Sequence, residues 1–416
     1  MIKAWEPRRS GKSIWIIAVV FLGAVPIVHA NEPEKLNVFE AGQGGYAIYR
    51  IPGLVVTSRG TVLAYGEARR GGGAGGAVEV LMRRSTDGGR TWGPPIRVSH
   101  DADDVPPSPV APKTREGNGR TAGNPVAIAD AETGAVHLLY CVEYGHCFYR
   151  RSDDDGLTFS PPVEINAAFE AFRPEYDWKV LATGPGHGVQ LATGRLVVAV
   201  WLSTAAGRNA HHPSVTATIY SDDHGKTWRR GAIAARSTAE HPDPNEAAIV
   251  ALADDRVMLN IRNESPARRR LVTISADGAS GWSTPTLVPD LPEPVCMGSL
   301  ALASANPATG RERWLLFANP DHPELLAHHG GGPPPKGWSD RKNLAIKLST
   351  DDGKTWPTTR TLEPGPSAYS DLAVLPDGTI LCFYERPQAH VDRPARTGTA
   401  LTLARFSLDW LMHEHP

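Results

Sequence analysis

A short motif present in five copies constrains the fold of this chain more than any other feature. In each copy an aspartate follows a serine by two residues, and an aromatic side chain closes the motif seven residues after the serine. The copies begin at residues 85, 152, 221, 275 and 349, and the copy at 275 is degenerate. A repeat of this length indicates a stacked or radial array rather than separate domains.

Each copy has the composition of a hairpin turn. An apolar segment precedes it, the serine and aspartate can hydrogen-bond within the turn, and glycine can adopt a backbone conformation that a Cβ atom would forbid. The closing aromatic side chain is expected to pack on the sheet. A calcium loop is the competing interpretation of the acidic copy at residues 152–156, although no glutamate occupies the closing ligand position there.

These observations predict an all-β, six-bladed β-propeller. Four-stranded blades repeated radially leave only short, protected edges. Five motif-bearing blades, with a sixth blade shared between the two ends of the chain, would close the wheel over about residues 36–411. Helical periodicity is nearly absent, and residues 167–172 form at most a short helical turn. We expect a single propeller domain over residues 31–416, without a linker or second domain.

The first thirty residues are predicted to be a signal peptide. Basic residues between Lys3 and Lys12 precede an apolar stretch over residues 14–28, which is short for a membrane span and is interrupted by Pro26. Residues 28–30 offer a small-residue cleavage site. We therefore expect an exported protein with no stable membrane span after cleavage. An uncleaved membrane anchor is the alternative.

Charge excludes one class of partner. The formal net charge of the 416 residues is -2, which gives no electrostatic reason to expect nucleic acid. Arg268–Arg270 is the only basic cluster in the body of the chain, and we expect it to be a solvated turn, with a binding patch as the alternative.

Four cysteines are too few for a disulfide framework in a chain of this length. Cys141 and Cys147 flank a plausible hairpin tip and could pair across it. Cys296 and Cys382 have apolar neighbours and are expected to be buried free thiols. No Cys/His spacing matches a zinc site.

The repeats, together with a second motif, resemble those of a known family. The repeats are similar to the Asp boxes of sialidases, and Tyr49–Pro52 (Tyr-Arg-Ile-Pro) resembles the family's Tyr/Phe-Arg-Ile-Pro motif. The stretch from Trp178 to His187 also resembles the bacterial and animal branches of the family. Asp boxes alone recur in many other propellers, but their combination with the Arg-Ile-Pro motif is specific. The resemblance covers nearly the whole mature chain.

The resemblance implies three arginines that bind a carboxylate. Sialic acid carries a carboxylate on its anomeric carbon, and a planar guanidinium binds such a group through two parallel hydrogen bonds. The matching positions are Arg50, Arg262 and Arg341, and Glu385 matches the carboxylate that holds the first arginine. Surface salt bridges are the alternative for the arginines, and a charge on the rim is the alternative for Glu385.

The resemblance also implies a nucleophile and its base. Tyr369 matches the family's nucleophile, Glu246 matches the base, and Glu240 is the second candidate for the base. A tyrosine ionises at about pH 10, so it needs a base to take its proton. A carboxylate nucleophile would be repelled by the substrate's own carboxylate, which explains why sialidases are the tyrosine exception among glycosidases.

Two further positions match residues that contact the sugar in this family. Arg69 and Asn124 are expected to face the bound sugar and its N-acyl group. Trp201 either lines the same pocket or is a buried tryptophan of a blade. A core tyrosine with a satisfied hydroxyl is the alternative for Tyr369.

The chain departs from the family at the general acid. Sialidases carry an aspartate between the Arg-Ile-Pro motif and the first repeat, which protonates the leaving oxygen and then activates water. The matching position is Ala74, and no carboxylate lies between Glu67 and Glu79. General acid–base help is worth about 10²–10⁴-fold, and good leaving groups need it less. A carboxylate from residues 101–104 could take its place.

We therefore expect a monomeric, retaining exo-α-sialidase that acts on sialylated glycoconjugates and needs no metal or cofactor. Two other functions stay open. The first is an enzyme for another acidic glycan, such as a deaminated-sialate hydrolase or a uronate lyase, whose product would absorb in the ultraviolet. The second is a lectin-like propeller that binds sialic acid without turnover.

Overall fold

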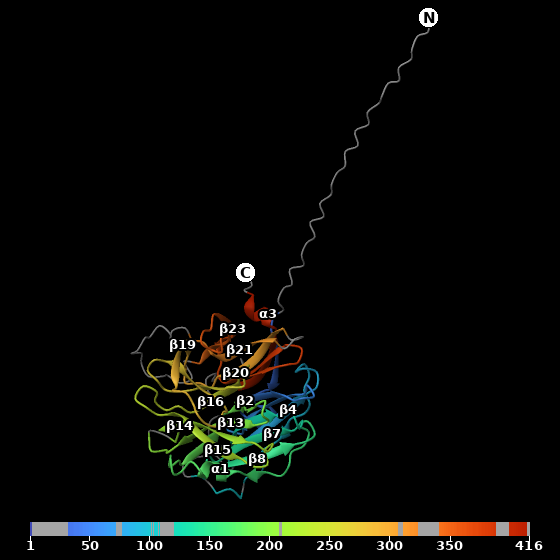
Figure 1. Ribbon diagram of the computed structural model, residues 1–416. Helices are drawn as coiled ribbons and strands as arrows, with labels where there is room; N and C mark the ends of the chain where they lie inside the picture. The colour runs from blue at the N-terminus through green and yellow to red at the C-terminus, as the bar shows by residue number, and fades with distance from the viewer. Residues whose placement is uncertain are drawn as a thin grey trace.

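The six predicted blades are present as six sheets in the computed structural model of the chain (Figure 1). The structure describes residue 1 and residues 32–71, 77–100, 102, 104–106, 108, 120–207, 210–306, 311–322, 341–387 and 399–413. Within them, helix is confined to the short elements η1 (Gln43–Gly45), α1 (Asn166–Glu170) and α3 (Leu408–Met412). The prediction of an all-β, six-bladed propeller is confirmed.

The first three blades follow the order of the chain, except that one short strand from the segment of blade 3 joins blade 2. Blade 1 contains β2 (Ile48–Val56), β3 (Val62–Arg69), β4 (Val78–Ser85) and β5 (Ile96–Arg97). Blade 2 contains β6 (Ala122–Ala129), β7 (Val136–Val142), β8 (His146–Ser152) and β9 (Val163–Glu164), with β11 (Gly186–His187) parallel to β6. Blade 3 contains β10 (Val180–Thr183), β13 (Leu196–Ser203), β14 (Ser214–Ser221) and β15 (Arg229–Arg236), with β12 (Val189–Gln190) paired to β13.

The remaining blades continue in order around the wheel. Blade 4 contains β16 (Ala247–Ala251), β17 (Val257–Ile261), β18 (Arg269–Ser275) and β19 (Thr286–Pro292). Blade 5 contains β20 (Ser299–Asn306), β21 (Arg311–Pro320), β22 (Lys342–Ser349) and β23 (Thr358–Pro366). Blade 6 contains β24 (Ser370–Val374), β25 (Ile380–Pro387), β26 (Thr399–Phe406) and β1 (Glu34–Phe39).

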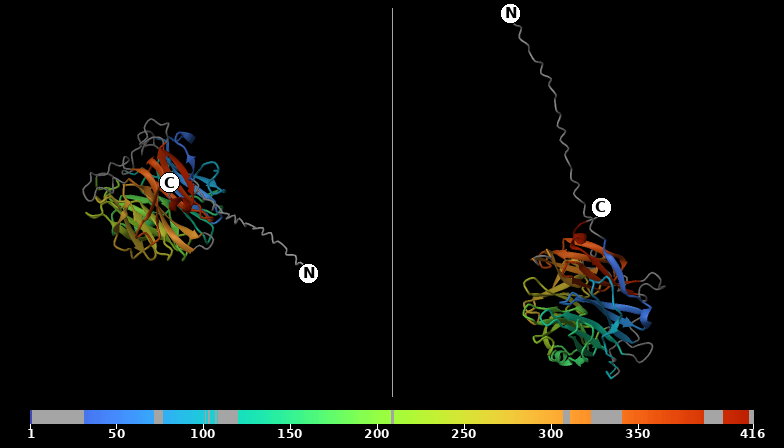
Figure 2. Two further views of the ribbon diagram at one scale, coloured as in Figure 1. Left: turned by 90° about the horizontal axis from the view of Figure 1, so that it is seen from above. Right: turned by 90° about the vertical axis from the view of Figure 1, so that its right-hand side faces the viewer.

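The N-terminal strand closes the wheel. β1 is the outermost strand of blade 6 and pairs antiparallel with β26, from Glu34 opposite Arg405 to Phe39 opposite Leu401. The first strand of the chain therefore lies beside the last one, as the right-hand view of Figure 2 shows. The sequence predicted a blade shared between the two ends, and the structure assigns its outer strand to the N-terminus.

Apolar side chains between the blades form the core. Every residue of β7 and of β13 is buried, so both faces of these strands are covered. A middle strand of a blade packs against the blade on either side, and a strand covered on both faces carries a nearly continuous apolar sequence. Adjacent blades also contact each other through their first strands, as β2 does with β24 and β6. This packing holds the inner ends of the blades, and the loops there, in place.

The repeated turns share one hydrogen-bond pattern. In the four complete copies the serine Oγ lies 2.7–2.8 Å from the aspartate Oδ1 and accepts the glycine N–H at 2.8 Å. The glycine has φ between 77° and 89°, where a side chain would be strained. The aspartate also accepts the backbone N–H of the following threonine at 2.9 Å. The motif thus forms the hydrogen-bonded hairpin turn expected from its composition.

One expectation about charge was wrong. We expected Arg268–Arg270 to be a solvated turn, but Arg270 is fully buried and Arg268 is 5 % exposed. Arg270 avoids the cost of an unpaired buried charge because it forms an ion pair with Glu293, which is also fully buried. The alternation of side chains along β18 turns this arginine toward the interior.

All four cysteines are buried free thiols, as expected for Cys296 and Cys382. Cys141 and Cys147 lie directly opposite each other on β7 and β8, so the hairpin between them is present, but no disulfide joins its thiols. Residues 2–31, which carry the predicted signal peptide, lie outside the described residues. In the described part of the chain no helix has the length and apolar character needed to span a membrane.

Candidate active site

The residues expected to act on a substrate come from different blades but lie at one end of the propeller. Arg50 is near the start of β2, Glu246 directly precedes β16 and Tyr369 directly precedes β24, and these are the first strands of their blades. Arg262 directly follows the second strand β17, and Arg341 directly precedes the third strand β22. In an antiparallel blade the start of strand one, the end of strand two and the start of strand three share one end. The topology therefore brings these residues together.

The phenol of Tyr369 lies at the centre of this group. Its hydroxyl donates a hydrogen bond to Glu246 Oε2 at 2.6 Å. Arg262 Nη1 donates to the same hydroxyl at 2.8 Å and forms an ion pair with Glu246 at 2.5 Å. The tyrosine, the carboxylate and one guanidinium thus form a closed triangle of hydrogen bonds, in which the carboxylate is placed to accept the phenolic proton.

The other two arginines flank the tyrosine ring. The guanidinium carbon of Arg50 lies 5.2 Å from the ring centroid of Tyr369, and that of Arg341 lies 5.3 Å away. With Arg262, three guanidinium groups from three blades surround one phenol. An arrangement of several guanidinium groups around one point favours binding of a carboxylate or another planar anion.

Neighbouring groups hold these arginines in place. Glu385 is 1 % exposed, forms an ion pair with Arg50 at 3.1 Å and accepts the backbone N–H of Ile51 at 2.8 Å. Arg341 donates to the carbonyl oxygen of Val295 at 2.5 Å. The structure therefore places Glu385 against Arg50, which is the contact that the resemblance described above implies.

The charges in the site act on one another. Burial would raise the pKa of Glu246, but Arg262 and the Tyr369 hydroxyl outweigh it and lower that pKa below its usual value. Burial, with the negative charge of Glu246, raises the pKa of Tyr369 well above 10. The resting pair is consequently an ionised carboxylate beside a neutral phenol, and the tyrosine can attack only as its proton moves to Glu246.

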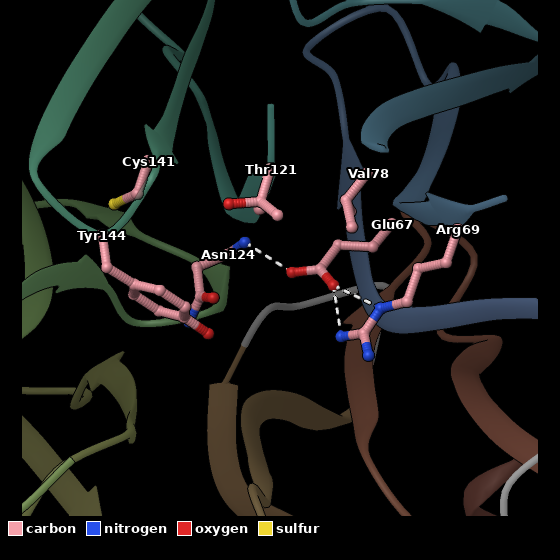
Figure 3. Close-up of a pocket in the computed structure, with 8 residues that line it drawn as sticks. Glu67, Arg69, Val78, Thr121, Asn124, Cys141 and Tyr144 are labelled. Atoms are coloured by element: carbon pink, nitrogen blue, oxygen red, sulfur yellow. Dashed lines mark hydrogen bonds and ion pairs between the residues drawn. The ribbon is translucent and has the colours of Figure 1, made fainter. Parts of the chain in front are cut away.

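A small pocket, shown in Figure 3, lies near this group, because the charge of Glu385 acts on its lining residue Arg69 and that of Glu246 acts on Tyr144. Glu67 and Arg69 on β3 line it and form an ion pair, and Glu67 Oε1 also accepts the backbone N–H of Asn124 at 2.8 Å. Asn124 has φ of 52°, and its side-chain amide donates to the carbonyl of Thr183 at 3.3 Å. A Cβ atom at Gly123 would lie 2.5 Å from Glu67 Oε1, so a larger residue there would displace this carboxylate.

Three residues of the site were not anticipated from the sequence: Glu67, Tyr144 and His211. Tyr144 follows β7 with φ of 53°, lines the pocket and has its ring 5.7 Å from that of His211. His211 stacks on Trp201 at 4.9 Å, and burial together with the charge of Arg262 lowers its pKa to about 4. Trp201 is 1 % exposed and lies behind these two rings. No motif marks Tyr144 or His211, although the cysteines around Tyr144 indicated a hairpin tip.

The other residues that the sequence offered for the base and for the general acid are Glu240, Ala74 and residues 101–104. Glu240 is exposed on the segment after β15, whereas Glu246 contacts Tyr369. Ala74, the position matched to the general acid, lies outside the described residues, as do residues 101 and 103. Asp104 is described and is exposed.

One group in the described part of the chain has the geometry to hold a metal ion. It consists of His212, Asp243 and Glu264, whose ligand atoms lie within 4.8 Å of one another. His212 Nε2 lies 2.9 Å from Glu264 Oε1 and 3.7 Å from Asp243 Oδ2. These contacts connect the segments that carry Glu246 and Arg262.

Comparison with known proteins gives one consistent result. Residues 60–382 match the family described as the BNR repeat-like domain. A sialidase of Micromonospora viridifaciens is 31% identical over 417 residues, covering 94% of this chain and 56% of that protein. A sialidase of Bacteroides fragilis is 28% identical over 383 residues, covering 86% of this chain and 63% of that protein. The chain thus spans about three fifths of the length of these two relatives.

Similarity extends to solved structures. A Hadza microbial sialidase superimposes with a TM-score of 0.68 at 24% identity, over 91% of this chain and 69% of that one. At this identity the likeness bears on the fold, and it agrees with the six sheets described above.

Proposed function

The chain belongs to the sialidase superfamily, and from this membership we propose that it is a retaining exo-α-sialidase of terminal sialic acids. One observation carries the proposal. Three guanidinium groups converge on the hydroxyl and ring of a tyrosine whose proton is directed at a carboxylate. This arrangement suits a sugar that carries an acidic group on its reacting carbon.

In the proposed mechanism, Arg50, Arg262 and Arg341 bind the substrate carboxylate and hold the anomeric carbon over Tyr369. The Tyr369 oxygen attacks this carbon as its proton passes to Glu246, and the bond to the aglycone oxygen breaks. Water then attacks the same carbon and gives up one proton to the solvent, which offsets the proton that the departed aglycone takes from it. The tyrosine oxygen leaves, and Glu246 returns its proton to it. Two displacements at one carbon retain its configuration.

The proton that the departing aglycone oxygen needs has no donor among the residues named in this mechanism. An aglycone of high pKa must be protonated as it leaves, and Ala74 replaces the aspartate that does this in the family. We therefore propose that the chain cleaves natural sialosides slowly, by roughly 10²–10⁴-fold relative to an enzyme with the acid, and activated aryl sialosides much better. The same gap supports a second candidate function, a propeller that binds sialic acid without cleaving it.

The decisive experiment compares an aryl sialoside with sialyl-lactose. We expect hydrolysis of the aryl sialoside, slow hydrolysis of sialyl-lactose and loss of both activities in Tyr369→Phe. Tyr384→Phe is the matched control, because that buried tyrosine also donates to a glutamate, Glu363, at 2.6 Å. Ala74→Asp should increase the rate on sialyl-lactose more than the rate on the aryl sialoside.

Each other outcome has one meaning. Binding of sialic acid by calorimetry without turnover of either substrate would establish the second candidate function. Absence of both binding and turnover would remove the sialic-acid assignment altogether.

We also propose that residues 1–30 direct export of a single-domain, monomeric protein, which the N-terminal residue and the mass of the exported product would test.

A further inference from the structure

A fully buried ion pair lies behind the arginines of the site. Arg270 on β18 and Glu293, which directly follows β19, meet at 2.5 Å between Nη1 and Oε2, and both side chains are 0 % exposed. Arg270 Nε also donates to Asn260 Oδ1 at 2.6 Å. The catalytic steps proposed above make no use of this pair.

The pair binds the backbone of two separate segments. Glu293 Oε1 accepts the N–H of Cys296 at 2.9 Å, and Arg270 Nη1 donates to the carbonyl of Cys296 at 2.7 Å. Glu293 Oε2 accepts the N–H of Asn263 at 3.3 Å, and Arg270 Nη2 donates to the carbonyl of Asn260 at 3.0 Å. The two side chains thus connect residues 260–263 with residues 293–296.

Each of these segments contacts one arginine of the site. Arg262 directly precedes Asn263, whose N–H Glu293 holds. Val295 directly precedes Cys296, and its carbonyl accepts the hydrogen bond from Arg341. Val295 has φ of 56°, which is strained for a β-branched residue and persists only where the surroundings impose it. The bonds of Glu293 and Arg270 to Cys296 hold the residue that directly follows Val295.

We propose that Glu293 and Arg270 are positioning residues that set the distance and orientation between Arg262 and Arg341 for binding of the substrate carboxylate. Stability alone does not explain the pair, since well-packed apolar residues of similar volume often replace a buried ion pair without loss of stability. Apolar residues, however, offer no donors or acceptors to the backbone of residues 260–263 and 293–296. The inference rests on the proposed sialidase function.

The first test substitutes Glu293→Gln, which keeps an acceptor for Cys296 but removes the charge that pairs with Arg270. We expect KM for an aryl sialoside to rise about 10- to 100-fold, with a smaller change in kcat, because the loss is in carboxylate binding. The matched control is Asp130→Asn in blade 2, whose ion pair with His137 at 3.2 Å is also 0 % exposed. Both variants should lose thermal stability, but Asp130→Asn should leave KM unchanged.

The second test removes both charges together with their bonds to the backbone. The double variant Arg270→Met/Glu293→Leu leaves backbone groups at residues 260, 263 and 296 without these partners, and it should keep the raised KM when assayed at a temperature at which it is folded. A double variant with the KM of the wild-type protein would overturn the inference, as would an unchanged KM in Glu293→Gln. Crystal structures of the wild type and Glu293→Gln give an answer independent of activity, because unmoved guanidinium groups of Arg262 and Arg341 would also overturn it. Failure of the wild type to bind or cleave sialosides would instead refute the proposed function.

Discussion

At the scale of single residues, the candidate site places charges close together where little water reaches them. Glu246 is 7 % exposed and Tyr369 is 5 % exposed, so their interaction is screened less than an exposed pair would be. The same burial that raises the pKa of the phenol strengthens its hydrogen bond to the carboxylate. In the proposed mechanism, Glu246 is therefore the group that lets the tyrosine lose its proton near neutral pH.

The charge of Arg341 and the shape of its side chain can be tested separately. Arg341→Lys keeps the positive charge but cannot form two parallel hydrogen bonds to a carboxylate. We expect KM for an aryl sialoside to rise about 10- to 100-fold, which corresponds to roughly 1.4–2.8 kcal/mol of binding free energy. Arg360→Lys on β23 is the control, because Arg360 also donates to a carbonyl, that of His413, and lies outside the group of arginines around Tyr369. Equal KM values for the two variants would contradict the proposed role.

At the scale of elements, the repeated turns stabilise the blades through carboxylates that stay ionised. Partial burial opposes the charge of Asp154, but hydrogen bonds from Thr158, Ser152 and Leu157 outweigh it and lower the pKa of Asp154 to about 2. The turn that begins at residue 349 has the same bonds, and the pKa of Asp351 is likewise lowered to about 2. Each turn therefore joins two strands of a blade through bonds that need a negative charge.

This predicts a loss of stability in acid. Because the pKa of Asp154 is lower in the folded protein, its contribution is present above the unfolded value of about 3.9 and is lost as the pH falls through about 2. Asp154→Asn should lower the free energy of unfolding near pH 7 by up to about 1 kcal/mol and weaken its dependence on pH below 4, as measured by urea unfolding. The neighbouring Asp153→Asn, whose side chain is 74% exposed, should change neither.

At the scale of the whole molecule, one carboxylate connects four blades. Asp371, in β24 of blade 6, accepts the backbone N–H of Leu54 in blade 1 at 2.8 Å and lies 3.0 Å from the hydroxyl of Ser299 in blade 5. His187 Nδ1, on β11 of blade 2, lies 2.8 Å from the same carboxylate. Asp371 is two residues from Tyr369, so the contacts that join these four blades also anchor the strand that directly follows the proposed nucleophile.

Asp371→Asn should therefore destabilise the whole propeller. Breaking a buried pair typically costs about 3–5 kcal/mol. Burial would lower the pKa of His187, but Asp371 raises it above the unfolded value of about 6.5. The histidine's contribution is thus fully present below pH 6.5 and is lost as the pH rises through the higher folded value.

Unfolding free energies between pH 6 and 9 test this sign. The wild type should lose stability over that range, and Asp371→Asn should lose less. His146→Gln, which removes a partly exposed histidine paired with Glu164, is the control and should follow the wild type. A pH dependence of Asp371→Asn equal to that of the wild type would exclude the His187–Asp371 pair as its source.

The repeated motif was sufficient to predict the blade number and the turn geometry, because both follow from bonds among residues close in the chain. The resemblance to sialidases implied Arg50, Arg262, Arg341 and Tyr369 as site residues, and the structure brings their side chains together.

The sequence analysis did not identify residues whose roles depend on partners far away in the chain. Arg270 looked like a solvated charge, because its partner Glu293 is 23 positions away and nothing local marks the pair. Tyr144 and His211 come from turns of different blades and meet only when blades 2 and 3 pack against each other. The choice of β1 as the closing strand also depended on pairing between the chain ends. The turns and strands could be predicted from the sequence alone, because they depend on bonds between residues close in the chain. Burial and long-range pairing depend on how the blades pack, so they could be established only from the folded structure.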